Sequence, residues 1–306
     1  MTSRFADNTF DDMGFVERDV PLAPLTWYKV GGPARFLLRP RSLEELQQAA
    51  RRCVDADVPM YVLGLGANLL VSDEGVDGAV FKLDQEHWRR VARQGSRLHV
   101  GAGTDVQKLV LHAARIGLSG IECMAGIPGT IGGATRMNAG GKFGDLGATV
   151  LDVSVMDSQG TVFERTRDDM VFDYRRSNIT APFILSVTLD LEEDDPQRIT
   201  ARTKEIWMYK RNTQPLNTKS AGCMFKNPRG LSAGALIDSA GLKGMRVGGA
   251  EVSVKHANFI VAHPGCKAAD IRALARLIRE RVLDKHGVEL ETEVQFWPSE
   301  SESADH

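Results

Sequence analysis

The sequence lacks the patterns that mark several common classes of protein. Neither G-x-G-x-x-G nor G-x-x-x-x-G-K-[ST] occurs, so the two most common nucleotide-binding loops are absent. The 4 cysteines form no C-x-x-C pair and the 7 histidines form no H-E-x-x-H motif, so we expect no metal site. No apolar run approaches membrane-spanning length, and the acidic start MTSRFADNTFDDMGF is not typical of a signal peptide. We therefore expect a cytoplasmic protein with reduced thiols.

The overall composition is that of a globular protein. The 306 residues are enough for two or three domains, and 42% hydrophobic with 25% charged residues is ordinary for a folded chain. The formal net charge of −2 argues against a general nucleic-acid binder. We expect a small-molecule substrate, and neither nucleic acid nor a membrane as partner.

One stretch, Gly120 to Gly141, is unusually rich in glycine, with 7 glycines among 22 residues. Glycine lets a backbone approach a ligand closely, and unpaired N–H groups in such a loop form an anion-binding concavity. Pro128 stiffens the loop, and apolar residues lie between the glycines. The stretch favours a buried loop against a flat ligand with phosphates. A tightly packed turn between two strands is the alternative.

A second candidate turn reads Gly64-Leu65-Gly66-Ala67-Asn68 between two apolar runs. Its N–H groups are suited to a diphosphate, although the same residue types also form ordinary hairpins.

The remaining pattern predicts mixed strands and helices. Residues 1–20 read as a loosely ordered tail, and residues 25–38 as strand, glycine turn and strand. Ser42 and Glu45 form a capping box that predicts a helix with Cys53 on its buried face. We expect further strands near 60–63, 69–71, 78–83, 97–101, 150–156, 161–164, 183–191, 251–261 and 288–297, helices near 105–116, 195–210, 232–240 and 268–286, and a polar loop at 172–177.

Eight segments in order resemble one family. They are 26–34, 63–75, 101–110, 120–140, 174–177, 221–228, 256–262 and 288–294. The chain resembles the UDP-N-acetylenolpyruvoylglucosamine reductases (MurB) of peptidoglycan precursor synthesis, in their shorter type II form.

The resemblance implies an α+β fold with noncovalent FAD. A two-subdomain FAD-binding unit of the vanillyl-alcohol-oxidase/PCMH type (21–95 and 96–195) would precede an α+β substrate-binding domain (196–298), with tails at 1–20 and 299–306. It implies reduction of UDP-N-acetylglucosamine enolpyruvate to UDP-N-acetylmuramate with NADPH as hydride donor.

The family chemistry needs a fixed cation and two proton-handling groups. By resemblance, Arg175 stabilises the intermediate, Glu293 assists it, and Cys223 donates the proton where many members have serine. A water is the alternative donor. Without the resemblance, Arg175 and Glu293 read as ordinary surface residues.

The resemblance also implies two sets of binding residues. Those for the cofactor are Gly64, Gly66, Ala67, Asn68, Leu69, Gly126, Ile127, Pro128, Gly129, Gly132, Gly133, Ala134 and Asn138. Those for the substrate are Tyr174, Arg211, Lys226 and Asn227.

Two other functions remain open on the residues. The first is another noncovalent FAD-dependent oxidoreductase of the same fold, and the second is a non-catalytic protein that keeps the nucleotide site. The joint presence of Arg175, Cys223 and Glu293 argues against the second.

Overall fold

The computed structural model describes residues 5–298 of the chain. Its packing separates two compact units. Unit 1 comprises Met1–Asp19, Arg35–Leu65 and Asp77–Tyr209, and unit 2 comprises Val20–Ala34, Gly66–Val76 and Lys210–His306. The three-domain division with boundaries at 95 and 195 stays a prediction.

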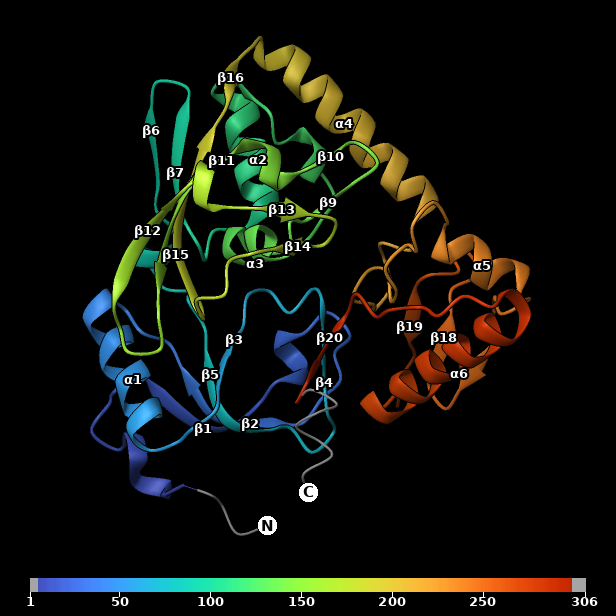
Figure 1. Ribbon diagram of the computed structural model, residues 1–306, viewed down its shortest axis with the longest axis horizontal. Helices are drawn as coiled ribbons and strands as arrows, with labels where there is room; N and C mark the ends of the chain where they lie inside the picture. Colours follow the sequence, from blue (N-terminus) through green and yellow to red (C-terminus); the bar gives the residue numbers. More distant parts are fainter. Residues whose placement is uncertain (1–4, 299–306) are drawn as a thin grey trace. The chain divides into compact units, whose positions relative to one another are not determined.

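The core of unit 1 lies against a five-stranded antiparallel sheet (Figure 1). Along β7, the buried Leu98 and Val100 alternate with the exposed Arg97 and His99, which is the two-residue period of a half-buried strand. Helices α2 (Val106–Arg115) and α3 (Ile131–Arg136) contribute apolar residues to the same core. The strand order is β12 (Val162–Thr166), β11 (Val150–Met156), β15 (Phe183–Asp190), β7 (Arg97–Gly101) and β6 (Val91–Gln94).

A four-stranded sheet, whose residues belong mostly to unit 1, packs with helix α1 (Leu43–Asp55). Ser42 caps this helix by accepting the Glu45 N–H at 3.3 Å, and Cys53 is fully buried, so the helix start and the buried cysteine are confirmed. The predicted capping box forms only in part, because the Glu45 carboxylate accepts the Arg41 N–H at 2.6 Å instead of the Ser42 N–H. The strand order is β1 (Val16–Pro21), β2 (Pro33–Leu38), β5 (Val76–Phe81) and β3 (Met60–Val62).

Two predictions for the start of the chain are wrong. The 3-10 helix η1 (Asp7–Phe10) and strand β1 occupy the expected loose tail, and Phe10 is 2% exposed. Residues 25–32 form no strand: Ala23–Leu25 is a 3-10 helix, η2, and Lys29 takes a positive φ of 60°. A left-handed residue breaks the extended backbone that the apolar pattern predicted.

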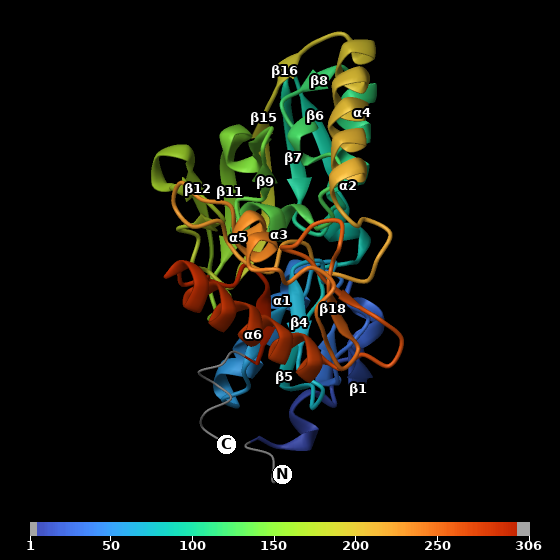
Figure 2. The same ribbon diagram turned by 90° about the vertical axis from the view of Figure 1, so that its right-hand side faces the viewer.

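In unit 2, a three-stranded antiparallel sheet packs against the long helix α6 (Figure 2). The predicted stripe of α6 is confirmed, because Ile271, Leu274, Ile278 and Val282 are all fully buried. Strands β4 and β20 form a separate parallel pair. The elements of this unit are β17 (Arg246–Val247), β18 (Ala250–Val252), β19 (Ile260–Ala262), α5 (Ala233–Ser239), α6 (Ala268–His286), β4 (Leu69–Val71) and β20 (Gln295–Trp297).

Two predicted strands are shorter than expected. A turn at 253–259 separates β18 from β19, closed by the Ser253 N–H donating to the Phe259 carbonyl at 2.8 Å. Only Gln295–Trp297 of the stretch 288–297 is a strand. The predicted tail 299–306 lies outside the described residues.

The remaining elements of the described chain are one long helix and several short helices and strands. The long helix is α4 (Pro196–Thr213), which confirms the helix expected at 195–210. No helix among residues 5–298 has the length and apolar character needed to cross a membrane. The others are η3 (Glu86–Arg89), β8 (Leu118–Ser119), η4 (Glu122–Met124), β9 (Gly140–Gly141), β10 (Gly144–Asp145), η5 (Leu146–Thr149), η6 (Arg167–Asp169), β13 (Phe172–Asp173), β14 (Arg176–Ser177) and β16 (Glu192–Glu193).

Candidate active site

The turn between β3 and β4 begins at Gly64, where packing leaves no room for a side chain. A Cβ added to Gly64 would lie 2.7 Å from Thr130 Oγ1. The Gly64 carbonyl accepts a hydrogen bond of 2.8 Å from Lys82 Nζ, a side chain that is 9% exposed. Burial lowers the pKa of the Lys82 ammonium. Sequence reasoning missed this buried lysine, since one lysine after a strand carries no signal.

Gly66 is required for a different reason. Its φ is +64°, and an added Cβ would lie 2.5 Å from the Leu25 carbonyl oxygen. The Trp27 N–H fixes the turn by donating to the Gly66 carbonyl at 3.0 Å. The backbone N–H groups of 64–68 donate to no acceptor within residues 5–298. This run of five donors fits the phosphates of a dinucleotide cofactor.

The second glycine turn is held by Gln107 of α2. The Gln107 side chain donates to the carbonyls of Met124 (2.9 Å) and Ile127 (2.6 Å) and accepts the Gly126 N–H at 2.7 Å. Gly126 has a φ of +75°, which suits glycine. The turn is therefore rigid, as Pro128 predicted.

Most N–H groups of this second turn are already paired, contrary to the expected concavity of free donors. Ile131 and Gly132 donate to the backbone carbonyls of Thr104 and Ala102, both at 2.9 Å. Gly133 donates to Thr130 Oγ1 at 3.3 Å. A Cβ added to Gly129 would meet nothing within 4 Å, so this glycine borders open space. Gly132 packs against Ala102, and Ala134 is buried in α3. Gly129 is the place in this turn where a flat ligand can approach.

The Asn138 side chain connects the glycine stretch to strand β13 and to the 3-10 helix η5 by hydrogen bonds. Its side chain is 3% exposed, donates to the Asp173 carbonyl at 3.0 Å and accepts the Gly147 N–H at 2.9 Å. Its φ of +42° is a conformation that asparagine tolerates. These bonds give Asn138 a structural role.

Arg175 lies at the tip of a hairpin formed by β13 and β14, where a polar loop was expected. Its φ is +56°, and its Nη2 donates to the Gly140 carbonyl at 3.0 Å. Its guanidinium carbon lies 5.0 Å from the centre of the Tyr174 ring. The hairpin thus presents a held cation beside a half-exposed aromatic ring.

In unit 2, Asn258 forms hydrogen bonds with the backbone of the two residues that follow Cys223. The Phe225 N–H donates to Asn258 Oδ1 at 3.0 Å, and Asn258 Nδ2 donates to the Phe225 carbonyl at 2.8 Å. The Met224 N–H donates to the Asn258 carbonyl at 2.7 Å. Asn258 is 2% exposed, so these bonds are shielded from water. Cys223 itself is partly exposed.

The chain near Glu293 lies on the other side of the same segment. The Glu293 N–H donates to the Met224 carbonyl at 2.8 Å, and Asn68 Nδ2 donates to the Glu293 carbonyl at 3.0 Å. The Gln295 N–H donates to the Asn68 carbonyl at 3.1 Å. The structure therefore brings Asn68, Glu293 and the neighbour of Cys223 together.

His256 supports this arrangement. Its Nδ1 lies 3.3 Å from the Asn258 N–H, and its ring meets the Phe259 ring edge-to-face at 4.9 Å. Burial lowers the pKa of the His256 imidazole, which keeps Nδ1 able to accept.

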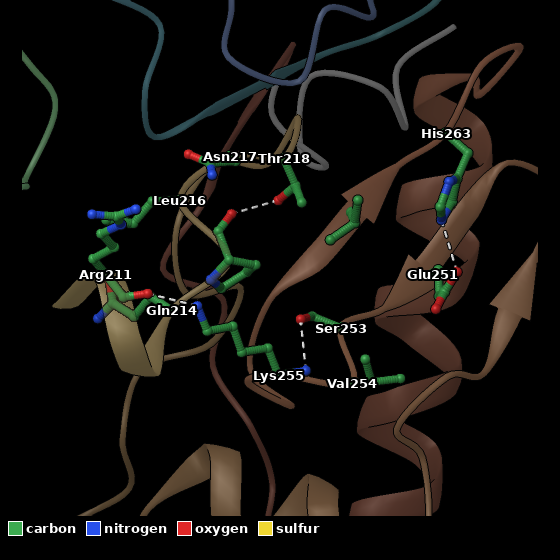
Figure 3. A pocket seen from close by; sticks show the side chains of 12 residues that line it. Arg211, Gln214, Leu216, Asn217, Thr218, Glu251, Ser253, Val254, Lys255 and His263 are labelled. Carbon is green, nitrogen blue, oxygen red and sulfur yellow. Dashed lines mark hydrogen bonds and ion pairs between the residues drawn. The ribbon is translucent and has the colours of Figure 1, made fainter. Parts of the chain in front are cut away.

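The predicted substrate residues of unit 2 have different surroundings. Lys226 pairs with Glu291, and Asn227 Oδ1 accepts the Ala233 N–H at 3.0 Å. Arg211 lines a pocket of about 320 Å³. Figure 3 shows Arg211 and Lys255 on one side of this pocket and the Glu251–His263 pair on the other. The remaining lining residues are Gln214, Pro215, Leu216, Asn217, Thr218, Ser253, Val254 and Val261.

Two stretches of the chain match the models of known protein families. Residues 34–166 match the FAD binding domain family, and residues 214–297 match the family described as UDP-N-acetylenolpyruvoylglucosamine reductase, C-terminal domain. The UDP-N-acetylenolpyruvoylglucosamine reductase of Moorella thermoacetica is 42% identical over 278 residues, covering 90% of this chain and 91% of that protein. The chain belongs to the UDP-N-acetylenolpyruvoylglucosamine reductase family.

Other members of the family are similar to a comparable degree. The reductase of an Anaeromyxobacter species is 43% identical over 287 residues, covering 92% of this chain and 89% of that protein. The crystal structure of UDP-N-acetylenolpyruvylglucosamine reductase (MurB) from Thermus caldophilus aligns with a TM-score of 0.80 and 41% identity, covering 92% of this chain and 99% of that one. The predicted family, the fold class, FAD as cofactor and an oxidoreductase activity are confirmed.

The site residues expected from this family fall into both units. Arg175 belongs to unit 1, and Cys223 and Glu293 belong to unit 2. The described residues contain no group of three or more His, Cys, Asp or Glu side chains suited to a metal ion. Gln107 and Lys82 were missed, because each acts through backbone groups far away in sequence.

Proposed function

We propose that this chain reduces UDP-N-acetylglucosamine enolpyruvate to UDP-N-acetylmuramate with NADPH through noncovalently bound FAD, in peptidoglycan precursor synthesis. The observation that carries the proposal is 42% identity to a reductase of that name over 90% of this chain and 91% of the relative. The alternative of another FAD-dependent oxidoreductase leaves the match of residues 214–297 unexplained.

Arg175 is the proposed cation of the second half-reaction. Hydride addition to the enolpyruvyl double bond builds negative charge on the carboxylate side of the substrate. A guanidinium already held by the Gly140 carbonyl and the Tyr174 ring can stabilise that charge with little reorganisation. We assign Tyr174 to the substrate for the same reason.

Cys223 is the proposed proton donor, and Glu293 its assistant. Reduction of the double bond needs one hydride and one proton, and the proton must come from a group beside the carbon that becomes the carbanion or enolate. The Glu293 N–H donates to the carbonyl of Met224, the residue after Cys223, and this hydrogen bond supports the pairing of Cys223 with Glu293. Asn68 and Asn258 hold the two strands of backbone that carry them.

The cofactor residues are proposed from the two turns. When bound, FAD supplies the hydride transfer that no side chain of this protein can perform. The free N–H groups of 64–68 would bind its diphosphate, and the open side of Gly129 leaves space for a flat ring. Arg211, Lys226 and Asn227 are the proposed contacts for the diphosphate of the substrate.

The cellular assignment follows from the reaction. A peptidoglycan precursor enzyme contributes to cell-wall synthesis, and hence to cell shape and division. We place it in the cytoplasm with no membrane or nucleic-acid partner. None of the described cysteines, Cys53, Cys123, Cys223 and Cys266, forms a disulfide bond, which supports a reducing compartment.

Purified protein incubated with FAD, NADPH and the enolpyruvyl substrate tests the proposal. Mass spectrometry should find a product two hydrogens heavier than the substrate, formed in proportion to the NADPH consumed. Acid denaturation should release the flavin into the supernatant. NADPH oxidation without that product would contradict the proposed substrate, and flavin retained on the precipitate would contradict noncovalent binding.

A further inference from the structure

A buried ammonium without a carboxylate partner lies behind the first glycine turn of unit 1. The Lys82 side chain is 9% exposed, and within residues 5–298 its Nζ makes one hydrogen bond, of 2.8 Å, to the Gly64 carbonyl. It forms no salt bridge with any carboxylate in that range, because Asp84, two residues later, pairs with Arg39 Nη1 at 2.6 Å instead. Lysine is rarely buried unless its charge is paired, so this ammonium lacks the partner that burial usually requires.

Two parallel strands place Lys82 beside this turn. Strand β3 pairs with β5 in parallel, with Val62 opposite Phe81, so the chain leaves both strands at the same edge of the sheet. Lys82 directly follows β5, and Gly64 follows β3 by two residues. The Leu63 N–H donates to the Phe81 carbonyl at 2.8 Å and continues the pairing beyond β3. The position of the ammonium is therefore set by the sheet.

The carbonyl that Lys82 binds belongs to a peptide whose N–H is one of the free donors of the turn. The Gly64–Leu65 peptide is trans, so its C=O and N–H point in opposite directions. The Leu65 N–H therefore points away from the ammonium, and it donates to no acceptor in the described part of the chain. A positive charge at the carbonyl polarises the peptide and makes its N–H a stronger donor to an anion.

The surroundings of Lys82 disfavour its charge in the protein alone. Burial lowers the pKa of the Lys82 ammonium most, Asp84 raises it, and Arg39 and Arg89 lower it further. An anion bound at the turn would reverse this balance, because an opposite charge nearby favours the charged form of lysine.

We propose that Lys82 is a positioning residue for FAD, and that its ammonium supplies the positive charge behind the Gly64–Leu65 peptide that stabilises the cofactor diphosphate. This inference rests on the proposed binding of that diphosphate by the N–H groups of 64–68. Those N–H groups are neutral and the diphosphate is an anion, so a buried cation compensates charge that the turn leaves uncompensated. It does so through the peptide, without occupying the space of the cofactor.

The FAD affinity of the full-length protein tests the inference. Lys82→Met keeps an apolar stem and removes the charge, so fluorescence titration of the flavin-free protein should give about a tenfold higher Kd for FAD, near the low end of what a bond to a charged group contributes. Lys82→Arg keeps the charge and should restore most of the affinity. Without FAD, the urea midpoint of Lys82→Met should equal or exceed that of the wild type, because an unpaired buried charge has been removed.

The matched control is Lys285→Met. The Lys285 ammonium also donates to a backbone carbonyl, that of Ser239, but its side chain is exposed, so this variant should leave the Kd for FAD unchanged.

Three results would overturn the inference. The first is an unchanged Kd in Lys82→Met. The second is a lower urea midpoint of Lys82→Met without FAD, because the lysine would then stabilise the fold rather than the cofactor. The third is a Kd as high in Lys82→Arg as in Lys82→Met at an unchanged urea midpoint. Normal FAD binding by Gly66→Ala would instead contradict the placement of the diphosphate at 64–68.

Discussion

Asn258→Ala is the substitution that most directly tests how the Cys223 segment is positioned. The Asn258 side chain makes one bond to the N–H and one to the carbonyl of Phe225, at 3.0 and 2.8 Å. Phe225 is fully buried, so water cannot replace either bond without opening the structure. Alanine therefore leaves a donor and an acceptor unpaired in the interior.

The expected cost follows from these two groups. A buried polar group that loses its partner costs about 1–3 kcal/mol, so the two together should lower the free energy of unfolding by about 2–6 kcal/mol. The segment that carries Cys223 should also lose its fixed position. We therefore expect slower reoxidation of the flavin by the enolpyruvyl substrate, with flavin reduction by NADPH little changed.

The chain offers a matched control in Asn178. Its side chain also accepts one backbone N–H, from Val171 at 2.9 Å, and donates to one carbonyl, that of Asp169, at 3.0 Å. Asn178 is exposed, so water replaces both bonds and Asn178→Ala should cost less than about 1 kcal/mol. Urea denaturation followed by circular dichroism compares the two variants. A midpoint shift in Asn258→Ala no larger than that in Asn178→Ala would refute the reasoning.

Three further predictions concern single residues. Gly66→Ala should lower the melting temperature and release FAD, because the alanine Cβ would lie 2.5 Å from the Leu25 carbonyl oxygen. The control is Gly95→Ala: Gly95 has a similar φ of +62° with nothing within 4 Å, so this variant should lower the free energy of unfolding by only about 1–2 kcal/mol. Burial lowers the pKa of the His256 imidazole, so the neutral ring stabilises the folded protein above the ordinary histidine pKa of about 6.5, and this stabilisation is lost as the pH falls. The urea midpoint of the wild type should therefore drop between pH 7.5 and pH 5, and that of His256→Gln should drop less. Cys223→Ser should retain turnover, whereas Cys223→Ala should slow flavin reoxidation by about 10²–10⁴ without affecting reduction, and stopped-flow absorbance separates the two phases.

Elements whose signals are local in sequence could be predicted well. Helix α6 spans Ala268–His286 as its apolar stripe and the following Gly287 indicate, and Gly287 takes the left-handed φ of +64°. Strands β7 and β11 also have the predicted bounds. Caps and periodicity depend on neighbouring residues alone, which is why these predictions succeeded.

Segments whose conformation depends on distant partners could not be predicted from local pattern. Residues 253–259 contain enough apolar residues for a strand, yet they turn where His256 accepts the Asn258 N–H. In the glycine stretch, the partner that occupies the Gly126 N–H is Gln107, 19 residues earlier. Glycine content indicated a close approach of backbone, but it could not tell a ligand from another part of the chain.

The candidate catalytic residues came from resemblance rather than from residue chemistry. Arg175, Cys223 and Glu293 are distant in sequence and have no spacing that indicates a common site. The structure explains the surroundings of Cys223 and Glu293 through the Met224 carbonyl, a backbone group that no side-chain pattern reveals.

Rapid-mixing absorbance of the FAD holoenzyme near 450 nm (about the wavelength of the oxidised flavin band) tests the central claim most directly. NADPH alone should bleach the flavin, and the enolpyruvyl substrate added afterwards should restore it without oxygen. Arg175→Ala should bleach normally and recover about 10²–10³ more slowly. A wild-type flavin that NADPH reduces but the enolpyruvyl substrate fails to reoxidise would contradict the proposed reaction.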